Sequence, residues 1–241
     1  MLKNHVEQER PGEEELGRRL EEARKRLGAL QMQIKEHGLP VLVLMEGWGT
    51  AGKGSTIGKI IRNIDPRFFK VATMAAPTEE ELRKPFLYRY FARIPEAGKF
   101  TFLDSGWMDE ITGDVLQGKL DDKGYASRID SVKRFERQLT DNGYLVMKFF
   151  FHIDEKEQRK RLDALLVNKD TSWRVSESDR WQNKHYDKCL KVFDRYLDDT
   201  NVSTAPWYIV DAHSRKWAQL QVLEMLCQGI DVALQNKSLA V

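Results

Sequence analysis

The sequence predicts an α/β protein with a phosphate-binding loop, in which helices cover both faces of a central, mostly parallel sheet. Three observations predict this fold. The length of 241 residues suits one domain of generous size. Short apolar runs alternate with amphipathic segments, and the first of these runs meets a glycine-rich turn with one lysine, directly before a helix-compatible segment. We therefore expect residues 1–241 to form a single three-layer α/β/α domain.

An amphipathic helix is predicted over residues 12–38, closed by Gly38 and Pro40. Its apolar residues recur at alternating spacings of four and three: Leu16, Leu20, Ala23, Leu27, Leu30 and Ile34. This narrow stripe could be a dimer seam, but packing on the domain's own sheet is the simpler interpretation.

The stretch from Val41 to Ile57 predicts a buried strand, a phosphate-binding loop and the start of a helix. Glycines let the backbone curl so that its N–H groups point into one concavity, the helix adds its positive end, and a lysine adds a full charge. The expected phosphate contacts are Gly47, Gly49, Thr50, Ala51, Gly52, Lys53, Gly54 and Ser55. Because Gly54 follows Lys53 where the common motif has a hydroxyl, Mg²⁺ must be held partly by another residue. A turn that merely joins strand to helix is the alternative.

After a second strand near Phe69 to Met74, Thr78 and Glu81 form a capping box that opens a helix with a kink at Pro85. Arginines interleave with aromatic residues along this helix, which suits phosphate and a stacked base. The predicted nucleotide-binding residues are Arg83, Tyr88, Arg89, Arg93 and Trp107. A solvated helix face is the alternative.

The next apolar run, Phe100 to Asp104, predicts a strand that ends in a carboxylate. Ligands of such sheets bind in the crevice beyond the strand ends. Asp104 is therefore the predicted Mg²⁺ anchor, directly or through water. An aspartate in this position can also simply form a turn.

Helical segments at about 107–118 and 124–141 precede a nearly continuous apolar run from Tyr144 to Ile153, which is typical of a central strand buried on both faces. Lys148 interrupts this run, so it is expected either to snorkel or to face a ligand. His152 is interpreted as a satisfied structural histidine in preference to one that acts on substrate.

Residues 154–180 predict a helical lid. Asp154 and Glu157 cap its first helix. Three consecutive cations beyond the end of the preceding strand are well placed to close over phosphates: Arg159, Lys160 and Arg161. Ordinary solvated helix charge is the alternative.

A last strand at residues 206–210 and a closing helix from about Ser214 complete the predicted fold. Cys189 and Cys227 fall inside helix-like segments, as core thiols of a reducing compartment do. The net charge of +2 creates no global field that would select nucleic acid or membrane. No apolar run approaches the roughly 18 to 20 residues of a membrane span. We expect a cytoplasmic protein without nucleic-acid or membrane partners.

Taken together, these stretches resemble the second family of polyphosphate kinases, which transfer phosphate between inorganic polyphosphate and nucleotides. The resemblance covers about residues 12–235. It rests on an ordered set of motifs: Glu46-Gly-Trp-Gly-Thr-Ala-Gly-Lys-Gly54, Asp65-Pro-Arg67, Pro77-Thr-Glu-Glu-Glu81, Pro85-Phe-Leu-Tyr-Arg-Tyr-Phe91, Glu157-Gln-Arg-Lys-Arg161 and Ala205-Pro-Trp207.

The resemblance implies a thymidylate-kinase-like core, Mg²⁺ dependence, a helical lid, and a homodimer or homotetramer. It implies catalytic roles for Lys53, Asp104 and Arg89, and a polyphosphate path along Lys148 and the cations at 159–161. The implied substrates are inorganic polyphosphate with AMP or ADP, and the reversible reaction makes ATP or ADP.

Two departures from the family pattern stand near the expected chemistry. Gly49 replaces a usual aspartate, and Asp104-Ser-Gly-Trp-Met108 replaces an Asp-Arg-Ser-Trp-Tyr run. The acids that could compensate are Glu46, Asp109 and Glu110, and the arginines are Arg83 and Arg89. Two alternative functions follow: a catalytically weakened domain that binds polyphosphate or nucleotide, and a nucleoside monophosphate kinase that uses ATP.

Overall fold

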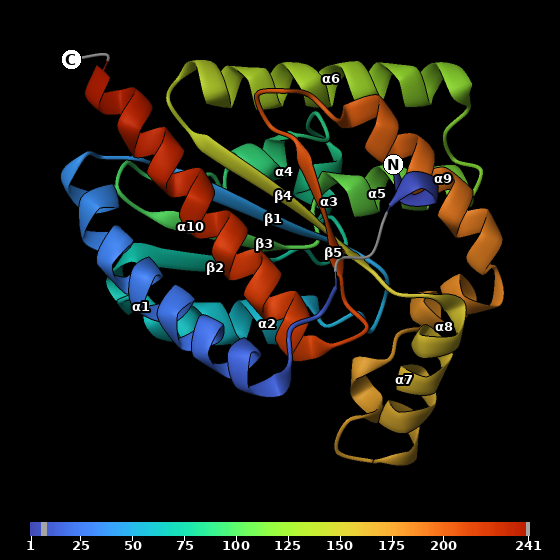
Figure 1. Ribbon diagram of the computed structural model, residues 1–241. Helices are drawn as coiled ribbons and strands as arrows, with labels where there is room; N and C mark the ends of the chain where they lie inside the picture. Colours follow the sequence, from blue (N-terminus) through green and yellow to red (C-terminus); the bar gives the residue numbers. More distant parts are fainter. Residues whose placement is uncertain (6–8, 240–241) are drawn as a thin grey trace.

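A five-stranded parallel sheet forms the centre of the computed structural model. Helices surround this sheet (Figure 1), and the structure describes residues 1–5 and 9–239. Residues 6–8 and 240–241, which the predicted domain of residues 1–241 includes, lie outside this description. The strand order is β2-β3-β1-β4-β5. Their bounds are β1 Val41–Gly47, β2 Phe69–Thr73, β3 Phe100–Asp104, β4 Leu145–His152 and β5 Trp207–Asp211. Every pair is parallel, so the predicted sheet is confirmed.

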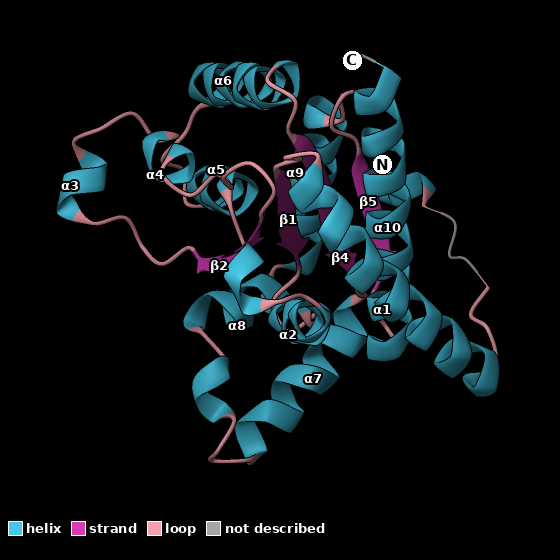
Figure 2. Cartoon of the chain, turned by 90° about the vertical axis from the view of Figure 1, so that its left-hand side faces the viewer, coloured by secondary structure: helices cyan, strands magenta, loops and turns pink. Residues whose placement is uncertain are grey.

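One helical layer consists of α1 (Glu13–Glu36), α2 (Lys53–Ile60) and α10 (Arg215–Leu239). Helix α10 packs on β4 and β5, and α1 packs chiefly on α10 (Figure 2). The predicted apolar stripe of α1 is buried in this contact, so it is not a free dimer seam. The helix therefore covers the sheet chiefly through α10, whereas the sequence suggested that it packs on the sheet itself.

The opposite layer consists of α5 (Trp107–Leu116), α6 (Asp122–Asp141) and α9 (Tyr186–Thr200). Helix α5 contacts β1, and α6 contacts β4. Asp121 begins α6 because its carboxylate accepts a hydrogen bond from the Gly124 N–H at 2.7 Å. With helices on both faces, the predicted three-layer architecture is confirmed.

The prediction of a single kinked helix after Thr78 is wrong. Two four-residue helices take its place, α3 (Glu79–Leu82) and α4 (Tyr88–Phe91). The capping box of Thr78 and Glu81 is present, but Pro85 lacks the N–H that a continuing helix needs, and its ring opposes the preceding turn. Shorter 3₁₀ turns connect other elements: η1 Leu2–Asn4, η2 Ile61–Asn63, η3 Pro66–Phe68 and η4 Ser172–Arg174.

Residues 154–184 form a helical arm that contains α7 (Glu155–Val167) and α8 (Glu177–Lys184). In Figures 1 and 2, α7 and the turn after it extend away from the rest of the protein, whereas α8 returns toward the carboxyl ends of the strands. A second capping box begins α8, because Ser176 and Asp179 exchange side-chain and backbone hydrogen bonds.

The predicted role of Lys148 on the polyphosphate path is wrong, because its side chain is 0% exposed. Its Nζ lies 2.7 Å from Glu136 Oε2, in α6, and donates to the Thr200 carbonyl oxygen at 2.9 Å. A buried amine needs such partners. Lys148 therefore belongs to the core under α6 and α9.

Both cysteines are buried free thiols, as expected, and burial raises the pKa of Cys189 to about 11. No helix in the described part of the chain is long and apolar enough to cross a membrane.

Candidate active site

The phosphate loop follows β1 directly and has the predicted backbone geometry. Gly47 has a φ of 123°, and a Cβ there would lie 2.4 Å from the carbonyl oxygen of Phe151. Gly52 has a φ of 104° and precedes Lys53, the first residue of α2. Both positions therefore require glycine. The loop delivers the chain into the N-terminus of α2, where backbone N–H groups are unpaired and favour anions.

Lys53 folds back over this loop. Its Nζ donates hydrogen bonds to the carbonyl oxygens of Gly47 at 2.9 Å and Trp48 at 3.1 Å. Within the described residues no carboxylate forms an ion pair with it. Its charge is therefore available to an anion that enters the loop.

Two carboxylates lie in the field of Lys53. Asp104 ends β3, and its Oδ2 would be 3.0 Å from a Cβ on Gly54, so it faces the first turn of α2. Asp109 lies in the first turn of α5. Burial raises the pKa of each carboxyl, and the charge of Lys53 opposes that shift in both. No group in the described residues donates a hydrogen bond to either carboxylate.

This donor set fits Mg²⁺. The ion commonly takes one or two carboxylates and completes its octahedron with water and substrate phosphate oxygens. No cluster of three or more acidic, histidine or cysteine side chains in the described part of the chain could hold a metal by itself. Asp104 and Asp109 thus suit an ion that arrives with phosphate.

Of the three acids considered as replacements for the missing loop aspartate, Asp109 alone has a carboxylate without a hydrogen-bond donor among the described residues. Glu46 is buried and accepts the backbone N–H of Met108 at 3.1 Å, which caps α5. Burial raises the pKa of Glu46 to about 8. Glu110 accepts the Tyr90 hydroxyl at 2.8 Å.

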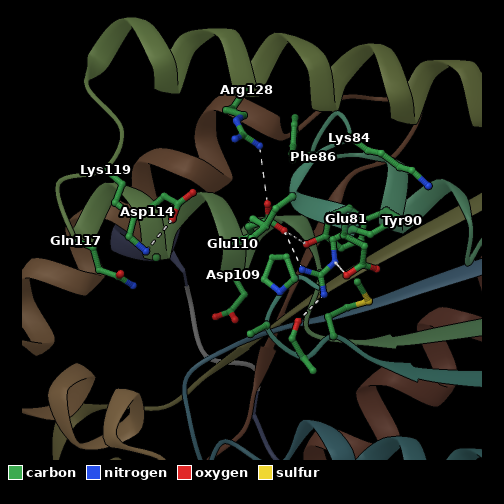
Figure 3. Close-up of a pocket in the computed structure, with 18 of the residues that line it drawn as sticks. Glu81, Lys84, Phe86, Tyr90, Asp109, Glu110, Asp114, Gln117, Lys119 and Arg128 are labelled. Carbon is green, nitrogen blue, oxygen red and sulfur yellow. Dashed lines mark hydrogen bonds and ion pairs between the residues drawn. The ribbon is translucent and has the colours of Figure 1, made fainter. Parts of the chain in front are cut away.

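A cleft of about 550 Å³ opens beside these acids, and we call it the α4–α5 cleft (Figure 3). Its walls come from residues 74–90, from α5, from Arg128 on α6 and from Ser178 on α8. The Arg128 guanidinium lies 3.9 Å from the centre of the Phe86 ring. This volume is typical of small-molecule sites.

Among the predicted nucleotide-binding residues, Arg89 alone lines the α4–α5 cleft. It is buried, donates to the Ala75 carbonyl oxygen, and has Nη1 3.7 Å from Glu110. Sequence reasoning missed Phe86 and Arg128. Phe86 stands inside a quoted motif, but nothing local in the sequence links Arg128 to this cleft.

The other predicted nucleotide contacts lie elsewhere. Trp107 is 0% exposed and donates its Nε1–H to Glu136 at 3.2 Å, so its prediction as a nucleotide-binding residue is wrong. Arg83 pairs with Glu79 on the surface, Tyr88 lies under the Lys84 ammonium, and Arg93 pairs with Glu81. None of these three lines the cleft.

Arg161 is a structural clamp, and its predicted contact with phosphate is wrong. Its Nη1 donates to the carbonyl oxygens of Thr50 at 3.3 Å and Ala51 at 3.1 Å. Its Nη2 donates to the carbonyl oxygens of Ala212 at 2.7 Å and His213 at 3.0 Å. Since Nε donates to Glu157, every N–H of the guanidinium is used inside the protein. Arg159, by contrast, is exposed, and within the described part of the chain its one ion pair is with Glu155.

Gly49 has no room for a side chain, because α8 approaches it closely. Its φ is not in the left-handed region. A Cβ at this position would lie 2.0 Å from Oδ1 of Asp179, and the Gly49 N–H donates to Gln182 Oε1 at 2.8 Å. Both side chains come from α8. The loop position without a side chain is thus covered by the helical arm.

His152 is structural, as interpreted from the sequence. Its Nδ1 accepts a hydrogen bond from Trp48 Nε1 at 3.1 Å, and burial lowers its pKa to about 4. The Trp48 ring also stacks on Tyr186, with ring centres 4.0 Å apart. These contacts hold Trp48, the loop residue after Gly47, against the start of α9.

Comparison with known proteins gives a consistent result. The family model described as Polyphosphate kinase 2 matches residues 11–238. The chain is 32% identical over 220 residues to a polyphosphate:AMP phosphotransferase of Pseudomonas aeruginosa, covering 91% of this chain and 44% of that protein. It is 28% identical to an ADP-polyphosphate phosphotransferase of the same species, covering 88% and 69%.

A crystal structure of a polyphosphate kinase 2 from Pseudomonas aeruginosa superposes with a TM-score of 0.91 at 25% sequence identity, covering 97% of this chain and 50% of that one. A second, from Arthrobacter aurescens, gives 0.84 at 26%, covering 88% and 77%. The chain spans 44% of the length of the Pseudomonas aeruginosa polyphosphate:AMP phosphotransferase, and 39% of the length of a polyphosphate:AMP phosphotransferase of Pseudomonas syringae to which it is also 32% identical.

Proposed function

The chain belongs to the polyphosphate kinase 2 family, and from that premise we propose that it transfers phosphoryl groups reversibly between inorganic polyphosphate and a nucleotide. One observation carries the proposal. Asp109 lines the α4–α5 cleft and also lies in the field of Lys53 on the phosphate loop. A donor phosphate on the loop and an acceptor in the cleft would therefore meet beside one carboxylate.

The acceptor is AMP or ADP. The names of two relatives support this, since one is a polyphosphate:AMP and the other an ADP-polyphosphate phosphotransferase. The α4–α5 cleft offers two guanidinium groups, Arg89 and Arg128, for a phosphate, and the rings of Phe86 and Tyr90 for apolar contact. Arg93, which the resemblance also assigns to the nucleotide, does not line the cleft and instead donates to the Arg89 carbonyl oxygen.

The chemistry needs positioning and neutralisation of charge more than covalent help. The loop N–H groups and Lys53 hold the donor phosphates, and Arg89 orients the acceptor. Asp104 and Asp109 are the residues that would hold Mg²⁺, which supplies charge neutralisation at the phosphate oxygens when it is bound. No covalent phosphoenzyme is required.

The polyphosphate chain leaves the loop along a second cavity of about 590 Å³, whose cations include Lys160, Arg215 and Lys216. We call it the basic cavity. Arg161 lies in its wall and also binds the loop carbonyls, so the basic cavity adjoins the loop. Lys160 and Lys216 each pair with one surface glutamate, pairs that are weak in water and can yield to a polyanion.

Residues 154–180 act as the lid over this path, with exposed Arg159 near its start. The family resemblance further assigns a homodimer or homotetramer, which sedimentation equilibrium tests. Because the stripe of α1 is buried inside the domain, the contact between copies uses another surface.

A comparison of phosphate donors tests the function. Purified protein is given AMP or ADP with Mg²⁺ and either long-chain polyphosphate or ATP, and the products are followed by ³¹P NMR. We expect rapid formation of ADP or ATP from polyphosphate. Faster turnover with ATP would support a nucleoside monophosphate kinase instead. Binding of polyphosphate without turnover from either donor would support a weakened binding domain.

A further inference from the structure

Helix α8 touches both the donor side and the acceptor side of the site. Ser178 lines the α4–α5 cleft, and the next residue, Asp179, lies against Gly49 of the phosphate loop. Gln182, one turn later, accepts the Gly49 N–H. One turn of α8 therefore spans the space between the loop and the cleft.

The two oxygens of Asp179 have different partners. Oδ2 accepts the backbone N–H and the hydroxyl of Ser176, both at 2.8 Å, and this caps α8. Oδ1 is the atom that would stand 2.0 Å from a Cβ on Gly49. The cap thus fixes one oxygen and turns the other toward the loop, where its charge also acts on Asp109.

Buried amides attach α8 to the rest of the arm and to the loop. Gln158 of α7 is 0% exposed, and its Nε2 donates to Gln182 Oε1 at 3.0 Å and to the Gly49 carbonyl oxygen at 3.4 Å. Asn183 donates to Gln158 Oε1 at 3.1 Å. Both backbone groups of Gly49 are therefore held by the arm, and a satisfied buried network of this kind is rigid.

We propose that α8 docks on the phosphate loop at Gly49, and that Asp179 and Gln182 are positioning residues that set the arm over the cleft and bring a carboxylate to the loop. The proposal rests on the proposed function, since it concerns the same site. It requires glycine at position 49, because any side chain there would displace the carboxylate of Asp179.

The first test separates charge from shape. Asp179→Asn keeps an oxygen that can cap α8 and fill the space beside Gly49, but it removes the charge. We expect unchanged hydrogen exchange in residues 177–184 and a fall in kcat of about 10-fold. Asp163→Asn, which neutralises an exposed acid of α7, is the matched control and should change neither. An Asp179→Asn variant as active as the control would overturn the role of the carboxylate.

The second test moves the carboxylate from the arm to the loop. Gly49→Ala should speed hydrogen exchange in residues 177–184, lower kcat, and raise the acceptor KM because the cleft loses its α8 wall. Adding Asp179→Ala removes the colliding oxygen and leaves the two Cβ atoms about 3.2 Å apart, a tight contact that small shifts can relieve. The protection of α8 from hydrogen exchange should therefore return, while kcat stays low. The double variant Gly49→Asp with Asp179→Ala should regain both the protection of residues 177–184 from hydrogen exchange and the kcat.

Two results would overturn the docking proposal. One is a Gly49→Ala variant with native exchange in α8 and native kcat. The other is a double alanine variant as active as the Gly49→Asp, Asp179→Ala double variant. If wild type has no turnover with any donor, the proposed function fails first, but the exchange measurements on α8 still decide whether it docks at Gly49.

Discussion

Lys53 and Lys148 carry the same charge in opposite surroundings. Among the described residues, the hydrogen bonds of the Lys53 ammonium go to backbone carbonyls of the phosphate loop. The Lys148 ammonium is sealed in the core against Glu136, and burial lowers its pKa. The comparison teaches that a lysine sealed against a buried carboxylate stabilises the core, whereas a lysine that contacts backbone carbonyls of the phosphate loop keeps its charge for phosphate. It also predicts that removal of Lys148 lowers the stability of the protein, whereas removal of Lys53 lowers its turnover.

The largest effect on stability should come from Lys148→Met. Glu136 would keep a buried charge without its partner, which typically costs about 3 to 5 kcal/mol. Urea unfolding of the variant should show that loss. The double variant Lys148→Met with Glu136→Gln should recover most of it, because a neutral amide can still accept from Trp107. A single variant as stable as wild type would contradict the buried-pair assignment.

A smaller effect, about 2 kcal/mol, is expected from Arg161→Ala, because four backbone carbonyls lose a charged donor. The salt dependence of polyphosphate binding should not change, since this guanidinium is consumed inside the protein. Arg159→Ala is the matched control. Because Arg159 is exposed, its removal should reduce the salt dependence of polyphosphate binding and leave the stability of the protein unchanged. The reverse pattern in a salt titration would place Arg161, and not Arg159, on the polyanion.

The effect that is smallest over a single pH unit concerns Glu46, next to the loop. Its folded pKa of about 8 exceeds the ordinary value, so the folded protein binds more protons than the unfolded chain between pH 4.5 and 8. Stability should therefore fall as pH rises through that window, by up to ~1.4 kcal/mol between pH 6 and 7 from this group. Glu46→Gln should remove this contribution. An unchanged pH slope of unfolding would show that Glu46 titrates normally.

The sequence was sufficient for the loop because the signals there are local. A strand, two glycines and a lysine are contiguous, and the structure has them in the predicted geometry. The parallel sheet and the end of β3 at Asp104 follow from apolar runs in the same way. These features depend on backbone conformation and burial, which short patterns encode.

The sequence was not sufficient for side chains whose partners are remote. Lys148, on β4, is neutralised by Glu136 on α6, and the carbonyls that occupy Arg161 come from two distant loops. Asp179 reaches Gly49 across 130 positions of the chain. No periodicity records such contacts, so exposed and buried cations look alike in the sequence.

The measurement that tests the central claim most directly is turnover of Lys53→Ala with polyphosphate and AMP or ADP, beside its unfolding curve. Lys53 gives charge to the transferred phosphates and lies outside the core, so we predict a loss of about 100-fold or more in kcat with unchanged stability. Activity within a few fold of wild type, in a folded variant, would contradict the assignment of phosphoryl transfer to this loop.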